Sequence, residues 1–267
     1  MAGLMHAVRK VRDGVRRFGL DFRTLRGRDQ WRAGLQVAWH PTDERTERVF
    51  ISTVEGFGAS ARFLVRNHND YIQSFHLAGK FFDEDELAII QEYYRGGTFL
   101  DIGANVGNHA IFAAIVLGAP KVIACEPYPE AYRILRCNIA LNDLGDVVEH
   151  VPYGIAETSG RGSLEGNVGS LGLTKVLLSS SGELELRSGD ELLGGEPVGF
   201  IKIDVEGLEM QVLSGLRETI ARCRPVMLVE VDEANIPAFE TLCNEWSYRI
   251  MRRFKVYREN TYFLIMP

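Results

Sequence analysis

The stretch from Thr98 to His109, Thr-Phe-Leu-Asp-Ile-Gly-Ala-Asn-Val-Gly-Asn-His, constrains the fold of this chain more than any other. Residues 98–102 are β-branched and apolar around one acid, as is typical of a buried parallel strand. From Asn108 onward the apolar spacing indicates a helix. The loop between them carries Gly103 and Gly107, because glycine permits a positive φ and a close approach of the backbone to a ligand. The loop amides and the helix N-terminus would point at that ligand.

Two nucleotide ligands suit such a turn. Dinucleotides favour G-x-G-x-x-G, with their pyrophosphate on the helix N-terminus. This loop is instead G-x-x-x-G, with Asn105 at the middle position, and Asp101 places a carboxylate where the strand opens. That carboxylate would repel pyrophosphate and attract the ammonium and sulfonium of S-adenosylmethionine (SAM). We therefore expect SAM, with an NAD-type oxidoreductase or a turn that binds nothing as the alternatives.

Further strands alternate with helices in the pattern of a doubly wound α/β fold. The final two strands, 248–254 and 260–266, have no helix between them and should pair antiparallel. The sequence therefore predicts a Rossmann-like, mostly parallel seven-stranded sheet with a C-terminal antiparallel strand pair. Its expected strands span residues 98–102, 121–126, 147–152, 200–205, 225–231, 248–254 and 260–266.

Acidic residues recur at the expected carboxyl ends of these strands, where ligands of open α/β sheets bind. Glu126 ends the second strand, at the place where a carboxylate grips a ribose diol. The other acids at strand ends are Asp101, Asp204, Glu206, Glu230 and Asp232. Crowded carboxylates require a cation or protonation to relieve their repulsion, which again favours a cationic cofactor.

Methyl transfer to a hydroxyl requires a group that removes the hydroxyl proton. Asp204 is the first candidate for this base and Glu206 the second, although Glu206 also suits a simple helix N-terminal carboxylate. The carboxylates at 204, 206, 230 or 232 are hard ligands that suit Mg²⁺; this option stays open, and no residue is assigned to a metal. His109, which begins a helix beside the glycine loop and would lie close to the cofactor, is a further candidate for the base, although we expect it to be a packing or solvent residue.

The remaining segments set the domain organisation. Residues 1–70 read as a basic helix over 3–19 followed by a small β extension, and residues 71–267 as the ligand-binding domain. Within that domain, the Gly- and Ser-rich segment 157–197 reads as a lid or β insertion, with a plain surface loop as the alternative. The basic segment either docks on its own domain as a helix, contacts a membrane surface or a polyanion, or is disordered.

Composition narrows the function classes. The net charge of −6 argues against nucleic acid as a partner. The four cysteines, at 125, 137, 223 and 243, form no C-x-x-C pair and are expected to be reduced core thiols. No stretch approaches the roughly 20 apolar residues of a membrane span, and no signal peptide is apparent. We therefore expect a cytoplasmic protein, membrane-peripheral if residues 3–19 contact lipid.

Four segments make the chain resemble the FkbM-type SAM-dependent methyltransferases, which have the class I methyltransferase fold. The run Ile201-Lys-Ile-Asp-Val-Glu-Gly-Leu-Glu209 is the most discriminating, because SAM enzymes in general do not require it. The other segments are Phe99–Gly107, Cys125–Pro129 with the asparagines 138 and 142, and Val212–Leu216 ahead of Pro225 and Glu230. Together they cover roughly residues 80–232.

The resemblance implies O-methylation of a sugar, glycoconjugate or natural-product hydroxyl, with a catalytically degenerate SAM-binding module as the alternative. It also implies the cofactor contacts. The loop would line the methionine half of SAM, Glu126 with Pro127 would hold the ribose, and Tyr153 with Gly154 would flank adenine. The implied loop contacts are Asp101, Gly103, Ala104, Asn105, Gly107 and Asn108. Asp190 stands where the family usually has Thr-Leu-Asp, but Ser188 and Gly189 depart from that pattern.

Overall fold

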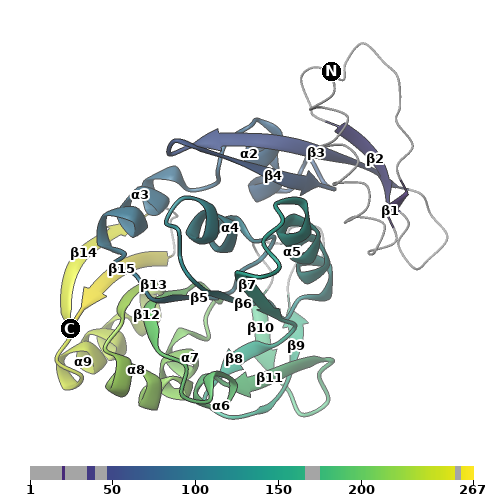
Figure 1. The fold of residues 1–267 in the computed structure, drawn as a ribbon. Coiled ribbons are helices and arrows are strands. Elements are labelled where there is room, and N and C mark those ends of the chain that lie inside the picture. The colour runs from purple at the N-terminus through teal and green to yellow at the C-terminus, as the bar shows by residue number, and fades with distance from the viewer. Residues whose placement is uncertain (1–19, 22–34, 40–46, 166–174, 256–259) are drawn as a thin grey trace.

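Seven strands form the central sheet of the protein, whose computed structural model is shown in Figure 1 and describes residues 20–21, 35–39, 47–165, 175–255 and 260–267. Their order in the sheet is β14-β15-β13-β12-β5-β6-β7. β15 runs antiparallel to both β13 and β14, whereas β12, β13, β5, β6 and β7 pair in parallel. The strands are β5 (Thr98–Ile102), β6 (Val122–Cys125), β7 (Val148–Val151), β12 (Val198–Ile203), β13 (Val226–Asp232), β14 (Arg249–Lys255) and β15 (Asn260–Met266). The predicted class I sheet with its C-terminal antiparallel pair is confirmed.

Helices cover both faces of this sheet (Figure 1). One face carries α3 (Glu84–Tyr93), α4 (Asn108–Ile115) and α5 (Pro129–Leu141). The other carries α6 (Gly189–Leu193), α7 (Glu209–Gly215), α8 (Arg217–Cys223) and α9 (Ile236–Glu245), the last preceded by the 3₁₀ turn η3 (Glu233–Asn235). α7 and α8 are two separate helices, although the apolar spacing of residues 208–222 alone predicts a single one. Gly215 lies so close to β8 that a Cβ there would be 2.0 Å from the carbonyl oxygen of Ala156.

Alternate residues along each central strand pack into two separate hydrophobic cores, one on each face of the sheet. This follows because successive side chains of a strand point to opposite faces. Phe99 and Phe200 stack with ring centroids 5.1 Å apart in the core that α3, α4 and α5 cover. Their neighbours Leu100 and Ile201 belong to the opposite core, under α7, α8 and α9. Burial on both faces explains why these strands are nearly continuous apolar runs.

The N-terminal part of the described chain forms a second, antiparallel sheet in the order β1-β2-β3-β4. Its strands are β1 (Leu20–Asp21), β2 (Leu35–Trp39), β3 (Glu47–Gly56) and β4 (Ala59–Val65), and α2 (Tyr71–Leu77) follows. Asn138 of α5 joins this sheet to the main domain, since its Oδ1 accepts a hydrogen bond from the Leu64 amide at 2.7 Å. The division of the chain at residue 70 stays a prediction. The helix expected over residues 3–19 lies outside the described residues.

A third sheet, in the order β10-β9-β11-β8, is built largely from the Gly- and Ser-rich segment 157–197. It consists of β8 (Gly154–Ala156), β9 (Gly160–Glu165), β10 (Lys175–Leu178) and β11 (Leu184–Ser188). β8 pairs in parallel with β11, which ties this sheet to the end of β7 just before it. In Figure 1 it lies beside the carboxyl ends of β6 and β7, next to the central sheet.

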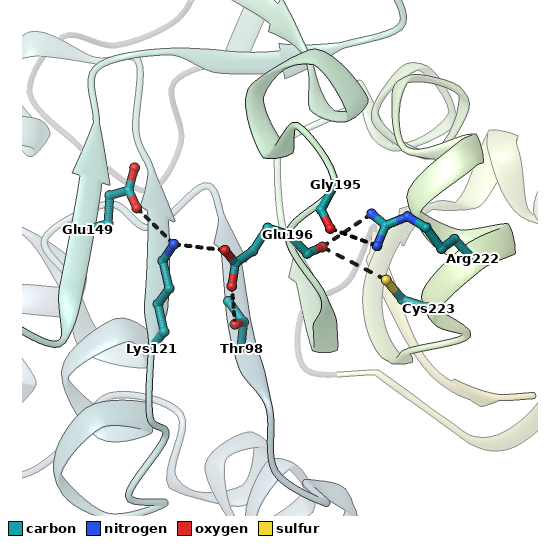
Figure 2. Close-up of polar contacts among 7 residues, drawn as sticks. All are labelled: Thr98, Lys121, Glu149, Gly195, Glu196, Arg222 and Cys223. Atoms are coloured by element: carbon teal, nitrogen blue, oxygen red, sulfur yellow. Dashed lines mark hydrogen bonds and ion pairs between the residues drawn. The ribbon is translucent and has the colours of Figure 1, made fainter.

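Polar contacts fasten the opposite, amino-terminal end of the sheet (Figure 2). Glu196 accepts a hydrogen bond from the Thr98 hydroxyl at 2.8 Å and pairs with Lys121 at 3.1 Å, which links the starts of β5, β6 and β12. Arg222 of α8 donates to the carbonyl oxygens of Gly195 and Glu196. These bonds belong to the scaffold, far from the carboxyl ends of the strands.

Within the described ranges, no helix is both long and apolar enough to cross a membrane.

Candidate active site

A cavity of roughly 430 Å³ opens at the carboxyl ends of β5, β6, β12 and β13. This volume falls in the usual range for small-molecule sites. Its wall combines the β5–α4 loop, the start of α3, and side chains from β15 and the third sheet. The lining acids are Asp83, Glu126, Asp204, Glu206 and Glu230, and Lys202 is the one lysine or arginine among the described lining residues. The cavity is therefore predominantly acidic, as the sequence pattern predicts.

The β5–α4 loop forms the floor of this cavity and depends on glycine at two positions. Gly103 has φ +80° and lies so close to β12 that a Cβ would be 1.8 Å from the carbonyl oxygen of Asp204. Gly107, with φ +93°, is the N-cap of α4, and a Cβ there would be 2.7 Å from Leu135. Asn105 also has a positive φ, of 48°. The loop thus packs closely against the end of β12, and its Gly103 and Ala104 amides both donate hydrogen bonds to the Cys125 carbonyl oxygen of β6.

Glu126 is held rigidly at the end of β6. Its two carboxylate oxygens accept hydrogen bonds from the backbone amides of Asn105, at 2.8 Å, and Tyr128, at 2.7 Å. Burial raises the pKa of Glu126 to about 7, although these two amides act in the opposite direction. Each carboxylate oxygen keeps a further lone pair, so the group can accept hydrogen bonds from two neighbouring hydroxyls.

Asp101 lies beneath the cavity rather than on its wall. It is fully buried, and neither of its carboxylate oxygens has a hydrogen-bond partner among the described residues. Burial raises the pKa of Asp101, while the positive charge of Lys202, its neighbour on β12, lowers it. A buried carboxylate without partners is unfavourable, so these orphaned oxygens suit the ammonium of a ligand above them.

Lys202 and Asp204 form an ion pair where β12 ends, with Nζ and Oδ2 2.9 Å apart. Burial raises the pKa of Asp204, but the Lys202 charge and hydrogen bonds outweigh it and lower the pKa to about 2. Burial, together with the charge of Asp204, raises the pKa of Glu230 to about 11. Within this pair, Asp204 therefore favours the ionised form and Glu230 the protonated form.

Glu206 lies within the connection between β12 and α7. Its φ is 54°, a conformation that non-glycine residues seldom adopt. Its carboxylate lines the cavity. One oxygen each of Asp204, Glu206 and Glu230 lie within 4.8 Å of one another. Both sequence-predicted catalytic residues therefore reach the same wall of the cavity.

Asp83 is a cavity residue that the sequence did not single out. It precedes α3, has φ 53°, and burial raises its pKa to about 7. Its acidic neighbours in the sequence suggested only a favourable helix N-terminus. Close to it, His109 Nε2 lies 3.1 Å from Glu86 Oε1. His109 is buried and lines the cavity, in contrast to the solvent position that was one expectation for it.

The other residues expected to contact the cofactor divide into two groups. Ala104, Pro127 and Gly154 line the cavity, whereas Gly107 and Tyr153 are not among its lining residues. The Tyr153 ring instead lies 4.3 Å from the Arg187 guanidinium. The assignment of all these residues to SAM stays a prediction.

Asn108 lines the cavity, but its side chain is occupied by scaffold contacts. Its amide group exchanges hydrogen bonds with the backbone of Phe82 and contacts His76 Nε2 at 3.0 Å. Only its backbone remains available for a cofactor contact.

Asp190 has a structural position in the described chain. Its two carboxylate oxygens accept hydrogen bonds from the backbone amides of Glu218 and Thr219, in the first turn of α8. It therefore satisfies otherwise unpaired donors of that helix and is not among the residues that line the cavity.

The third sheet supplies apolar side chains to the cavity. Leu164 of β9, Val176 of β10 and Leu186 of β11 all lie on its wall. Asn260 and Tyr262 of β15 also line it, although the sequence identified them only as strand residues. An acidic cavity with one apolar side suits a ligand that has both a cationic part and an aromatic base.

The protein is similar to characterised methyltransferases. A sequence model of the Methyltransferase FkbM domain matches residues 101–262, more than half of the chain. The hexuronic acid methyltransferase AglP of Haloferax volcanii is 29% identical over 175 residues, 64% of this chain and 69% of AglP. The methyltransferase sdnD of Sordaria araneosa is 25% identical over 191 residues, 57% of this chain and 74% of sdnD.

One solved structure with a similar fold is the methyltransferase FkbM from Methylobacillus flagellatus. It is 18% identical, with a TM-score of 0.45, and the match covers 73% of this chain but only 52% of that protein. The family match spans the glycine loop, Glu126, and the Lys202–Asp204 segment described above. The chain therefore belongs to the FkbM methyltransferase family and is a SAM-dependent methyltransferase.

Proposed function

We propose that this protein transfers a methyl group from SAM to a hydroxyl of a sugar, glycoconjugate or natural product. The observation that carries the proposal is the pair of carboxylates on either side of β5. Glu126 ends the strand on one side, and Asp204 follows the strand on the other, and both line one cavity. Two separate acidic groups in one cavity suit two substrates, a ribose-bearing cofactor and a hydroxyl-bearing acceptor.

Several residues fit the cofactor. Glu126 would accept the two ribose hydroxyls, and the orphaned oxygens of Asp101 would balance the positive charge of the methionine part. The backbone around Gly103, Ala104 and Asn105 would contact that part directly, because glycine at 103 lets the loop pack closely against the residue that follows β12. When bound, SAM supplies an electrophilic methyl group.

The chain's own contribution to the transfer is to hold and orient the acceptor. Asp204, kept ionised by Lys202, would accept a hydrogen bond from the acceptor hydroxyl and fix its direction. Glu206, partly exposed at the same wall, is the second residue that would position the acceptor or take its proton. The net charge of −6 and the acidic cavity both disfavour a nucleic-acid acceptor.

AglP is named as a hexuronic acid methyltransferase, so sugars are the first acceptors to test. The name of sdnD does not specify an acceptor. Purified protein would be incubated with methyl-labelled SAM and a panel of neutral sugars, glycosides, uronic acids and cell extracts. Label in an O-methyl group, located by NMR of the product, supports the proposal. Label on nitrogen or carbon, or tight SAM binding with no transfer to any member of the panel, would contradict it.

A further inference from the structure

Three carboxylates gather at one wall of the cavity. Asp204, Glu206 and Glu230 come from the ends of the neighbouring strands β12 and β13, and one oxygen of each lies within 4.8 Å of the others. Lys202 contacts Asp204 Oδ2 at 2.9 Å, but the same lysine also faces the buried Asp101. Carboxylates this close repel one another unless a shared proton or a further cation lies between them.

Glu230 provides a second and independent observation. Glu230 is only 3% exposed to solvent, and its Oε2 atom has no hydrogen-bond partner in the described part of the chain. The side chain nevertheless belongs to the cavity wall, between β12 and β15. A buried carboxylate oxygen without a partner is costly, so its position points to a ligand that it contacts.

We propose that Asp204, Glu206 and Glu230 bind one divalent metal ion of the Mg²⁺ or Mn²⁺ type beside the acceptor. All three offer hard carboxylate oxygens, which such ions prefer once the ion displaces any proton that Glu230 holds. In an octahedral shell with metal–oxygen distances of about 2.1 Å, ligand oxygens lie about 3 to 4 Å apart. The separation of these three oxygens, at most 4.8 Å, needs little adjustment to reach that geometry.

The metal site deepens the proposed function and rests on it. Three protein ligands leave coordination positions for water or for acceptor hydroxyls. A hydroxyl on such an ion loses its proton more easily, because the ion lowers its pKa. Acceptors with two neighbouring hydroxyls would then be favoured, since they can occupy two of the positions.

Metal binding itself is the direct test. Chelator-treated protein would be titrated with Mn²⁺, alone and with S-adenosylhomocysteine, while electron paramagnetic resonance records the free ion. We expect one Mn²⁺ per chain that Mg²⁺ displaces, and at least tenfold weaker binding by Glu206→Gln and by Glu230→Gln. Glu245→Gln, an exposed position on α9, removes the same charge and should bind as the wild type does.

Two outcomes would overturn the metal site. One is the absence of Mn²⁺ binding by the wild type, which would leave a shared proton between Asp204 and Glu230 to relieve the repulsion. The other is wild-type affinity in both variants, which would mark the ion as adventitious. Glu206 is partly exposed, so its variant tests the site even if Glu230→Gln fails to fold. SAM titration of the same samples separates failure of this site from failure of the proposed function.

Discussion

Asn138 Nδ2 donates a hydrogen bond to the carbonyl oxygen of Val106 at 2.7 Å, which ties α5 to the glycine loop. The same side chain accepts a hydrogen bond from the Leu64 amide of β4. Asn142, one turn later, makes the equivalent pair of bonds to the backbone of Arg62 but none to the loop. One asparagine therefore joins the N-terminal sheet to the cofactor site, and the other joins it only to the helix.

These two asparagines give a matched pair of variants. Asn138→Ala leaves a buried amide and a buried carbonyl unpaired, so we expect a loss of roughly 2–4 kcal/mol in the free energy of unfolding. Its SAM affinity should fall about tenfold, because the loop loses an anchor. Asn142→Ala should lose less stability and keep its SAM affinity. Denaturant titrations and calorimetry measure both effects; equal SAM affinity in the two variants would contradict the anchor.

Gly103 and Gly118 form a second pair. Both have a positive φ, but a Cβ at 103 would overlap the Asp204 carbonyl, whereas a Cβ at 118 would meet nothing within 4 Å. We expect Gly118→Ala to cost about 1–2 kcal/mol through backbone strain alone. Gly103→Ala should in addition weaken SAM binding more than 100-fold or prevent folding. Near-wild-type SAM binding by Gly103→Ala would show that the loop and β12 do not pack as described.

The pKa of Glu126 predicts a pH dependence of cofactor binding. A carboxylate that accepts two ribose hydroxyls must be ionised, and burial raises its pKa to about 7 in the free protein. SAM affinity should therefore decrease as the pH falls below about 7, approaching tenfold per pH unit, and level off above it. Glu126→Gln should bind more weakly, with a flatter profile between pH 5.5 and 8.5. Parallel profiles for the two proteins would remove Glu126 from the ribose site.

His76 predicts a pH dependence of stability. It is fully buried, stacked on Phe63, and burial lowers its pKa to about 4. Because the unfolded histidine has a pKa near 6.5, the unfolded chain binds the extra proton between about pH 6.5 and 4. Folding stability contributed by this group is therefore lost as the pH falls through that window.

The effect is measured as a difference between variants. Between pH 7 and pH 5, the wild type should lose about 2 kcal/mol more unfolding free energy than His76→Gln. His68→Gln, at an exposed position, should follow the wild type. The same loss in wild type and His76→Gln would mean that other groups govern acid stability.

Asp204→Asn separates cofactor binding from turnover. Asn keeps the shape but removes the charge that orients the acceptor hydroxyl, so turnover should fall by roughly 100-fold, while SAM affinity stays within a few-fold. Asp232→Asn is the control. Asp232 lies at the end of β13 much as Asp204 follows β12, but its carboxylate accepts a hydrogen bond from the Ala234 amide instead. Initial rates with labelled SAM measure the difference. Unchanged turnover in Asp204→Asn would reassign the acceptor side to other residues.

The central sheet and the rim of carboxylates could be predicted from the sequence because both follow from local patterns. Strands buried on two faces, such as 98–102 and 200–205, are apolar runs, and strand ends of a parallel sheet meet at one edge. Glu126 was predicted by the same reasoning, from its place at the end of the second strand. The structure adds the amides of Asn105 and Tyr128 that hold its carboxylate.

Other features depend on contacts between distant segments and left no local signal. Asp83 looked like an ordinary helix start until the fold placed it in the cavity. Lys202 interrupts an apolar strand, but only its register with Asp101 shows why a buried lysine is tolerated there. The sequence also did not indicate how deeply Asp101 is buried. The structure places this residue beneath the cavity floor and not on the cavity wall.

Calorimetric titration of the purified protein with SAM tests the central claim most directly. The wild type should bind one SAM per chain, and Asp101→Ala, which removes the buried negative charge under the glycine loop, should bind at least tenfold more weakly. NAD⁺ should give no heat of binding, because the acidic cavity disfavours a pyrophosphate. Absence of SAM binding by the wild type, or saturable binding of NAD⁺ in its place, would contradict the account.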